Sequence, residues 1–422
     1  MSGPVANNVF RSSGVVASAA GGLSWQDVVT ASTVTVEAGN GYPINTTSNT
    51  CTITLPSSAE AGDQIIFLDY ARNWGTNKII IDSNGLNYQG EDDTYTVEYD
   101  TDGQTVSIVY SGATVGWIPE SDVDVTDAPV AGPTQKAIFA YGSGLTNVSN
   151  LVNSSGVVGT DVTGVGTARR FLAACGYGFD KAIFAYGYTT GNVSMSNLVT
   201  NAGVVGTDVS GVGTARNRLA AASYGLSGQG IFGYGETSGS NTLSITNLVS
   251  SAGVVATDTS GVGTARSQLA AATYGSTGQA IFGYGSPTGL DGSQVSTTNL
   301  VSSSGVVAAD VSGVGTARRF LAAASYGGDK AIFGYGFTSG ATDVSMTNLV
   351  NSSGVVASDV TGVGTARGGL AAASYGGDKA LFSFGAPAVT NLVSSSGVVA
   401  TDVTQVGTAR DFIAGAGYSL SA

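Results

Sequence analysis

The sequence of 422 residues contains no histidine, the side chain that most often serves as a general base or a metal ligand. A nucleophile activated by histidine and a zinc site built on imidazole are therefore both excluded. The two cysteines, Cys51 and Cys175, lie far apart and in no motif. They cannot form a thiolate metal site, and we expect them to be buried apolar side chains. We predict neither a metal nor a cofactor.

Charged residues are scarce at 11%, and acidic ones dominate, which gives a net charge of −13. Nucleic-acid binding needs clustered Lys and Arg, and no such run exists, so we predict no nucleic-acid partner. No apolar run approaches the roughly 20 residues that span a bilayer, so we predict no membrane insertion. The N-terminus MSGPVANNVF lacks the basic and apolar segments of a secretory signal, so no signal peptide is predicted.

The sequence is rich in glycine and in repetition. The motif GTAR occurs six times, and its arginines are separated by 47, 50, 52, 49 and 43 residues. Repeats of about 40 to 50 residues are typical of propeller blades. In every copy the Asn of an NLV segment precedes the Arg by 19 residues. The arginines are Arg169, Arg216, Arg266, Arg318, Arg367 and Arg410.

Nearly all variation in repeat length falls between the glycine that ends KAIFGYG and the Asn of NLV. These gaps hold 7, 9, 11, 13, 11 and 5 residues, all odd numbers. A hairpin that grows by one residue on each strand keeps every side chain on its face, which explains even steps. We therefore predict that KAIFGYG pairs with the segment ending in NLV through a hairpin of variable height. LAAASYG and GVVASDV complete four predicted strands per repeat.

The repeats start and stop out of phase. Residue 136 begins KAIFAYG without a preceding LAAASYG strand, and the chain ends with GTARDFIAGAGYSLSA, which supplies that strand. In a circular array the two ends complete one unit and tie the ring shut, whereas an open solenoid needs polar capping repeats. We predict an all-β protein in which residues 136–422 form a six-bladed β-propeller with circular closure.

The part before the repeats has a different pattern. Residues 25–120 contain short alternating runs such as CTITL, QIIFLDY, KIIID, TYTVEYD and TVSIVYS, which predict a small β-domain. Residues 1–24 are expected to be a docking arm. Residues 121–135 are acidic and contain proline, which favours a linker.

Two resemblances follow from these motifs. The pattern ARRFLAAASYGGDKAIFGYG resembles the kelch blade, although GYG replaces the glycine pair and the late Trp of the blade is absent. The blocks INTTSNTCTITLPSSAEAGD, IIFLDYARNWGTNKIIIDSNG and SIVYSGATVGW resemble a small β-domain of bacteriophage tail fibres and other virion appendages. The second resemblance implies a homotrimer and other virion proteins, of tail or capsid, as partners.

Two sets of residues are candidate sites. The arginines of GTAR and an aspartate in each repeat could ring a channel, but their presence in every copy favours a structural role. The aromatic residue of GYG is expected to pack between blades. Function more often lies in the variable loops, which predict receptor binding. The aspartates are Asp161, Asp208, Asp258, Asp310, Asp359 and Asp402, and the loop residues are Tyr188, Asn192, Glu236, Asn241, Asp291, Gln294, Phe337 and Asp343.

The sequence thus predicts a virion protein of a bacteriophage, a tail fibre or spike, that docks by its N-terminus and presents the propeller to a host surface glycan or protein. Several weak contacts would add through effective concentration. One alternative is a head fibre or capsid-decorating protein without a specific receptor. Another is a depolymerase, because loop carboxylates could supply a glycosidase pair, but no motif supports one and we expect no enzyme.

Overall fold

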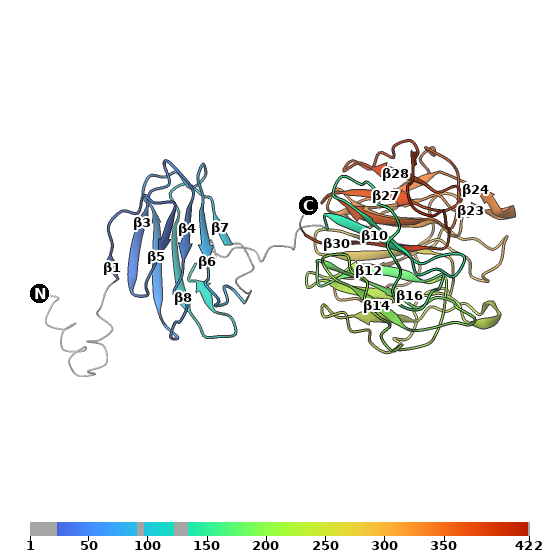
Figure 1. Cartoon of the computed structure of the whole chain (residues 1–422), viewed down its shortest axis with the longest axis horizontal. Helices are drawn as coiled ribbons and strands as arrows, with labels where there is room; N and C mark the ends of the chain where they lie inside the picture. Colours follow the sequence, from blue (N-terminus) through green and yellow to red (C-terminus); the bar gives the residue numbers. More distant parts are fainter. Residues whose placement is uncertain (1–22, 91–96, 122–133, 421–422) are drawn as a thin grey trace, which may run out of the picture. The chain divides into compact units, whose positions relative to one another are not determined.

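A computed structural model of the chain describes residues 23–90, 97–121 and 134–420. The chain divides into two compact units, Met1–Val130 and Ala131–Ala422 (Figure 1). The predicted arm 1–24 and linker 121–135 lie almost wholly outside the described residues. The described residues contain strands and short 3-10 turns but no α-helix, and therefore no helix long and apolar enough to cross a membrane. The all-β prediction is confirmed.

In the first unit the chain alternates between two sheets, ordered β1-β3-β5-β8-β9 and β2-β4-β6-β7. Buried and half-buried residues alternate along β4 and β5, so one face of each strand is buried. The buried faces enclose a core that includes Trp74 and Trp117. The strands are β1 (Ser24–Trp25), β2 (Thr33–Thr35), β3 (Asn40–Ile44), β4 (Cys51–Thr54), β5 (Gln64–Asp69), β6 (Ile79–Asp82), β7 (Val97–Tyr99), β8 (Thr105–Tyr110) and β9 (Trp117–Pro119).

The second unit contains six separate sheets of three or four strands, here named after their middle strands, and one two-stranded sheet. Each of the six has a first, a middle and a third strand, all antiparallel. The middle strands are β10 (Lys136–Ala140), β13 (Lys181–Ala185), β16 (Gln229–Gly233), β19 (Gln279–Gly283), β22 (Lys330–Gly334) and β27 (Lys379–Ser383). The first strands are β30 (Ala414–Tyr418), β12 (Ala173–Tyr177), β15 (Ala220–Tyr224), β18 (Ala270–Tyr274), β21 (Ala322–Tyr326) and β26 (Ala371–Tyr375). The third strands are β11 (Ser149–Val152), β14 (Ser196–Val199), β17 (Thr246–Val249), β20 (Thr298–Val301), β25 (Thr347–Val350) and β28 (Val389–Val393).

Both ends of the repeat region meet in the β10 sheet. Strand β30 from the C-terminus pairs with β10, with Lys136 opposite Tyr418 and Ala140 opposite Ala414. The predicted exchange of ends within one unit is therefore present. The first strands also contact one another in a closed cycle, β12–β15–β18–β21–β26–β30 and back to β12. The small side chains of LAAASYG permit this approach, because bulkier residues would hold the strands apart.

Two closed rings of backbone hydrogen bonds join the sheets, one at each end of the first strands. The first ring lies before these strands. The residue two positions after each GTAR arginine donates its amide to the carbonyl of the equivalent residue in the preceding sheet, as Arg218 does to Phe171 and Phe171 to Phe412. The second ring lies after the first strands. The residue that follows each first strand donates its amide to a carbonyl of the following sheet, as Gly225 does to Gly278. Since each ring passes through all six sheets, every sheet is fixed to both of its neighbours.

The prediction of a fourth strand is wrong for most repeats. Only the β27 sheet has one, β29 (Val403–Thr404); elsewhere GVVASDV makes two isolated bridges. In the β19 sheet Val301 pairs with Val307 and Thr298 with Val311, so the three residues 308–310 face the two residues 299 and 300. This bulge breaks the ladder. Asn299 Nδ2 donates a hydrogen bond to the Ala308 carbonyl, which the ladder leaves unpaired.

The pairing of KAIFGYG with the NLV segment is confirmed in all six sheets. The variable residues, however, do not simply lengthen the hairpin. The aromatic residue of each GYG has a positive φ, 65° in Tyr284, which ends the middle strand and redirects the chain. Beyond it, only β23 (Phe337–Thr338) and β24 (Thr342–Asp343) form a further ladder, and this hairpin lies at the side of the unit away from β30 (Figure 1).

Both cysteines are buried and free, as expected. Burial raises the pKa of Cys51 to about 11 and that of Cys175 to about 12. Both thiols therefore stay protonated at neutral pH and act as small apolar side chains.

Candidate functional site

The GTAR arginine, its Thr, and the Asn and Asp of the same sheet form a unit that recurs six times, here called the belt. In the β19 sheet the buried Arg266 donates from Nε to the Tyr284 carbonyl at 2.9 Å, from Nη1 to the Thr264 carbonyl at 3.1 Å and from Nη2 to Asn299 Oδ1 at 2.6 Å. Asp310 accepts from the Thr264 amide and hydroxyl and from Asn299 Nδ2. The belt therefore clamps the incoming chain to the outer part of the sheet it enters.

The ring closes through the same belt contacts. Arg410, near the C-terminus, donates to the Tyr141 carbonyl and to Asn150 Oδ1, and Asp161 accepts from Thr408. These contacts join residues about 250 positions apart in the chain. The belt thus uses one set of contacts for neighbours in sequence and for the two ends of the array.

The belt aspartates are held ionised. Partial burial by itself raises the pKa of Asp310, but hydrogen bonds from Thr264 and Asn299 and the charge of Arg266 together lower this pKa below its usual value. Burial lowers the pKa of the arginines, to about 10 in Arg410, which leaves them cationic at neutral pH. The pKa is lowered in the same way in the other five belt aspartates, Asp161, Asp208, Asp258, Asp359 and Asp402.

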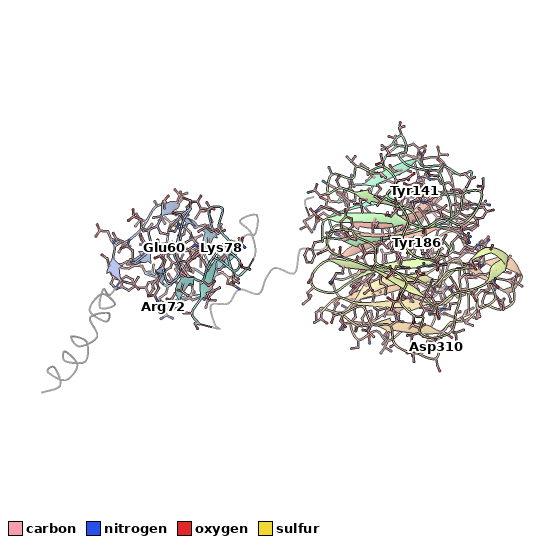
Figure 2. The ribbon with its side chains drawn as sticks, turned by 90° about the horizontal axis from the view of Figure 1, so that it is seen from below. Glu60, Arg72, Lys78, Tyr141, Tyr186 and Asp310 are labelled. Carbon is pink, nitrogen blue, oxygen red and sulfur yellow. The ribbon has the colours of Figure 1, made fainter. Side chains whose placement is uncertain are left out.

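The aromatic residues of GYG pack between sheets. Tyr141 lies against Phe184 of the next sheet, with ring centroids 5.5 Å apart, and under the guanidinium of Arg169 at 4.2 Å. Tyr141 and Tyr186 lie inside the unit, whereas Asp310 lies near its edge (Figure 2). The arginines and aromatic residues that recur in every repeat are thus occupied by contacts with the protein itself.

The variable loops contact one another in order and form a continuous series, here called the loop rim. Four loops take part, and each donates or accepts a side-chain hydrogen bond across to the next. The loops are 188–196, 236–246, 286–298 and 337–347; the bonds run from Asn192 Nδ2 to the Glu236 carbonyl at 3.4 Å, from Thr242 Oγ1 to the Pro287 carbonyl at 2.6 Å and from Gln294 Nε2 to the Thr338 carbonyl at 3.4 Å.

The predicted loop residues fall into two groups. Asn241, Asp291 and Asp343 are exposed, while Tyr188, Asn192, Gln294 and Phe337 are half-buried. Glu236 differs from expectation, because it is only 4% exposed and its carboxylate is used inside the protein. Arg218 Nη1 pairs with its Oε1, and Ser267 Oγ donates to its Oε2 at 2.6 Å. Glu236 therefore neutralises a neighbour instead of facing a receptor.

A second ring of residues lies beside the loop rim. It consists of the residue two positions after each GTAR arginine, and we call it the inner ring. All six have a positive φ, between 51° and 69°, although only one is glycine. Phe171 packs on Phe412 with ring centroids 4.5 Å apart, and Phe320 on Phe412 at 5.1 Å. The inner ring and the leucines and isoleucine that follow it line a small cavity of about 80 Å³. Its members are Phe171, Arg218, Gln268, Phe320, Gly369 and Phe412.

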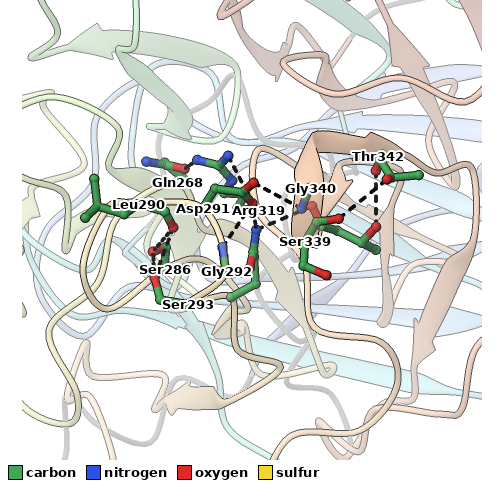
Figure 3. A network of polar contacts seen from close by, with 12 residues as sticks. Gln268, Ser286, Leu290, Asp291, Gly292, Ser293, Arg319, Ser339, Gly340 and Thr342 are labelled. Atoms are coloured by element: carbon green, nitrogen blue, oxygen red, sulfur yellow. Dashed lines mark hydrogen bonds and ion pairs between the residues drawn. The ribbon is translucent and has the colours of Figure 1, made fainter.

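Polar groups link the inner ring to the loop rim. Gln268 Oε1 accepts from Arg319 Nη1 at 3.1 Å, and Arg319 Nη2 lies 3.4 Å from Asp291 Oδ1 (Figure 3). The other oxygen of Asp291 accepts from the Gly340 amide of the next loop at 3.0 Å. Asp291 thus joins two loops and neutralises the arginine beneath them.

The inner ring was not among the residues predicted from the sequence, although a signal for it exists. The two residues after GTAR read RF, NR, SQ, RF, GG and DF in the six repeats, next to segments that are almost identical. A site on a repeated frame is expected where the repeats differ, and these positions differ as strongly as the loops. Within the described residues, no three His, Cys, Asp or Glu side chains gather as a metal site.

No protein-family model matches this chain, and no curated protein matches it.

Proposed function

We propose that the second unit is a six-bladed β-propeller. The separate sheets, the closed cycle of first strands, the sharing of the β10 sheet by both ends and the two backbone rings support this architecture. A propeller protects its strand edges by radial repetition and offers a rigid frame for loops. The kelch-like pattern of the repeats agrees with it.

We further propose that the protein is a structural component of a bacteriophage virion, a tail fibre or spike, that attaches to the host surface through the loop rim. The single observation that carries the adhesion role is the loop rim itself. In it four loops that differ between the repeats are joined by side-chain hydrogen bonds, while the frame beneath them stays constant. Binding residues on rigid scaffolds concentrate in such loops.

The first unit is proposed to attach the protein to other virion proteins and to form a homotrimer. Two large side chains of this unit, Trp25 and Tyr70, are 55% and 57% exposed. Exposed aromatic residues of this kind are enriched at protein interfaces. A capsid-decorating role would use the same attachment without a receptor.

Immunogold labelling of intact virions with an antibody against residues 136–422 tests the location. Gold at the tail supports host attachment, and gold over the capsid supports the decorating role instead. If gold does not bind intact particles that contain the protein, the proposed virion surface location is wrong.

Trimming the loop rim tests the adhesion role. The chain supplies its own short loop, APAVT at 386–390, which can replace residues 286–298 and 337–347. We expect the labelled, full-length variant to lose most of its binding to the bacterium on which the virus grows. Val355→Ser, at a side chain that is 61% exposed outside the loop rim, is the matched control. Equal binding by the trimmed variant and the control would contradict adhesion by these loops.

A further inference from the structure

The arginines around the inner ring differ in whether their charge is neutralised. Arg218 pairs with Glu236, and the Nη2 of Arg319 lies 3.4 Å from Asp291. Arg170 holds the position of Arg319, directly after the GTAR arginine, in the β13 sheet, but the described residues offer it neither an ion pair nor a side-chain hydrogen bond. Its Nε is buried without a partner, as are those of Arg218 and Arg319, but among the described residues only these two of the three arginines have an ion pair.

The cause lies in the loop of the preceding sheet. Arg319 is neutralised by Asp291 from the loop that follows β19, whereas the loop that follows β10, residues 143–149, contains no Asp or Glu. The first loop residue is bridged to the residue after the GTAR arginine, so Tyr188 faces Arg170 as Glu236 faces Asn217. Where the β16 sheet has a carboxylate, the β13 sheet therefore has a phenol ring. The Arg170 guanidinium lies 5.0 Å from the ring centroid of Phe171 and 5.8 Å from that of Tyr188. Aromatic faces hold a cation in place without neutralising it.

A second unsatisfied group lies in the same cluster. Asn217 is 7% exposed, and its Nδ2 donates to Asn192 Oδ1 at 2.6 Å. Its Oδ1 is buried and accepts no hydrogen bond. Asn192 is bridged to Tyr188, so one loop connects the free guanidinium to the free amide oxygen. Buried polar groups are almost always paired, and an unpaired one calls for an explanation.

We propose that this cluster binds a sugar residue that carries a carboxylate, within an acidic polysaccharide of the host surface. The inference rests on the proposed adhesion role and names its ligand. The free Arg170 guanidinium fits a carboxylate, which it can hold with two parallel hydrogen bonds. The half-buried Asn192 amide, which is bonded to Asn217, fits a hydroxyl group of the sugar, which both donates and accepts. The half-buried Tyr188 ring offers an apolar face to the sugar ring.

Burial and charge favour this ligand over a neutral sugar. A neutral saccharide would leave the Arg170 charge without a counter-ion, whereas a carboxylate supplies what Glu236 supplies to Arg218. The net charge of −13 makes an unneutralised cation on this surface all the more unusual. Long-range repulsion of an anionic ligand is weak at physiological salt, because charges beyond about 8 Å are screened.

The test uses the full chain and the purified surface polysaccharide of the bacterium on which the virus grows, in its native form and after chemical reduction of its carboxylates. We expect binding to the native form and a loss of about tenfold or more after reduction, since a charge-assisted contact is removed. Arg170→Gln should cause a similar loss. Arg72→Gln, at an exposed arginine of the first unit, is the control and should bind like the wild type.

A second variant copies the arrangement of the neighbouring sheet. Tyr188→Glu places a carboxylate at the loop position of Glu236, here bridged to Arg170 instead of Asn217, and should abolish binding while the unfolding transition stays unchanged. Binding that persists after carboxylate reduction or in Arg170→Gln overturns this inference and leaves adhesion intact. The inference is also overturned if treatment of whole cells with protease abolishes binding, because the receptor is then a protein. If the wild type binds neither cells nor polysaccharide, the proposed function fails and the inference with it.

Discussion

The belt and the inner ring lie in the same six segments of the chain, yet they follow opposite rules. The belt keeps its Arg, Asn, Asp and Thr in every repeat, and each side chain bonds to the protein itself. Two residues further on, the inner ring keeps its backbone conformation but carries Phe in three repeats and Arg, Gln and Gly in the others. The comparison shows that closure of the array depends on identical side chains, whereas specificity can use the positions where only the backbone is fixed.

Removal of the closing strand has the largest expected effect on this comparison. A chain ending at Thr408 lacks Arg410, Phe412 and β30, so the belt, the inner ring and the β10 sheet all open at one point. We expect the second unit to lose its cooperative unfolding transition, monitored by circular dichroism. All three tryptophans lie in the first unit, so their fluorescence should report an unchanged transition there. A chain that lacks only residues 421 and 422 is the control, and equal behaviour of the two truncations would contradict closure by β30.

Acid should open the belt before it affects the inner ring. The folded pKa of each belt aspartate lies below its unfolded value, so the unfolded chain binds more protons in that pH range. This contribution to stability is complete above about pH 4 and is lost as the pH falls through the folded pKa values. Denaturant titrations of the second unit between about pH 2 and pH 5 should show a steep fall in stability. Asp310→Asn should reduce the slope by about one proton; an unchanged slope would show that this carboxyl is not linked to folding.

Breaking one belt arginine should cost less than opening the ring. Arg318→Met leaves the Asn348 amide oxygen and the carbonyls of Tyr335 and Thr316 without their donor in a buried place. We expect the free energy of unfolding of the second unit to fall by about 3 kcal/mol, measured by urea denaturation. Lys330→Met removes an exposed ion pair and should change it by less than about 1 kcal/mol. Similar effects of the two substitutions would contradict the structural role of the belt.

The smallest effect is expected at the glycine of the inner ring. Gly369 has a φ of 69°, and a Cβ there would lie 3.0 Å from the Phe412 ring. Gly369→Ala should lower the stability of the second unit by about 1 kcal/mol from backbone strain, and somewhat more from this contact. Gly144→Ala carries the same positive φ with no atom within 4 Å, so it isolates the backbone contribution. If Gly369→Ala is the milder of the two in thermal denaturation, the inner ring is less tightly packed than described.

Much of the fold could be predicted from the sequence because its signals are local and repeated. The apolar run KAIFGYG, buried on both faces, gave the middle strand, and the phase of the repeats gave the pairing of β10 with β30. The fourth strand could not be predicted correctly, because GVVASDV has the β-branched residues of a strand. Its register depends on the Asn299 side chain and a bulge, and these are tertiary contacts.

The loops show the same division. Their even steps in length predicted that they would vary around a fixed frame, but the fate of each side chain depended on its neighbours in space. Glu236 and Asp291 are both carboxylates in variable loops, yet one is buried against Arg218 and the other is exposed over Arg319. Sequence distance does not encode these pairs, because each is formed only when the sheets meet.

By itself, therefore, the sequence determined the first three strands of each repeat, their order and the sharing of one sheet by the two ends, since these depend on period, side-chain alternation and phase. Only the tertiary structure decided which charges are neutralised. The two residues after GTAR look like arbitrary variation until the backbone rings bring them together at the inner ring. Arg170 is then distinguished from Arg319, at the same place in its repeat, by the ion pair of Arg319 with Asp291 of the preceding loop, because an ion pair depends on distance in space and not along the chain.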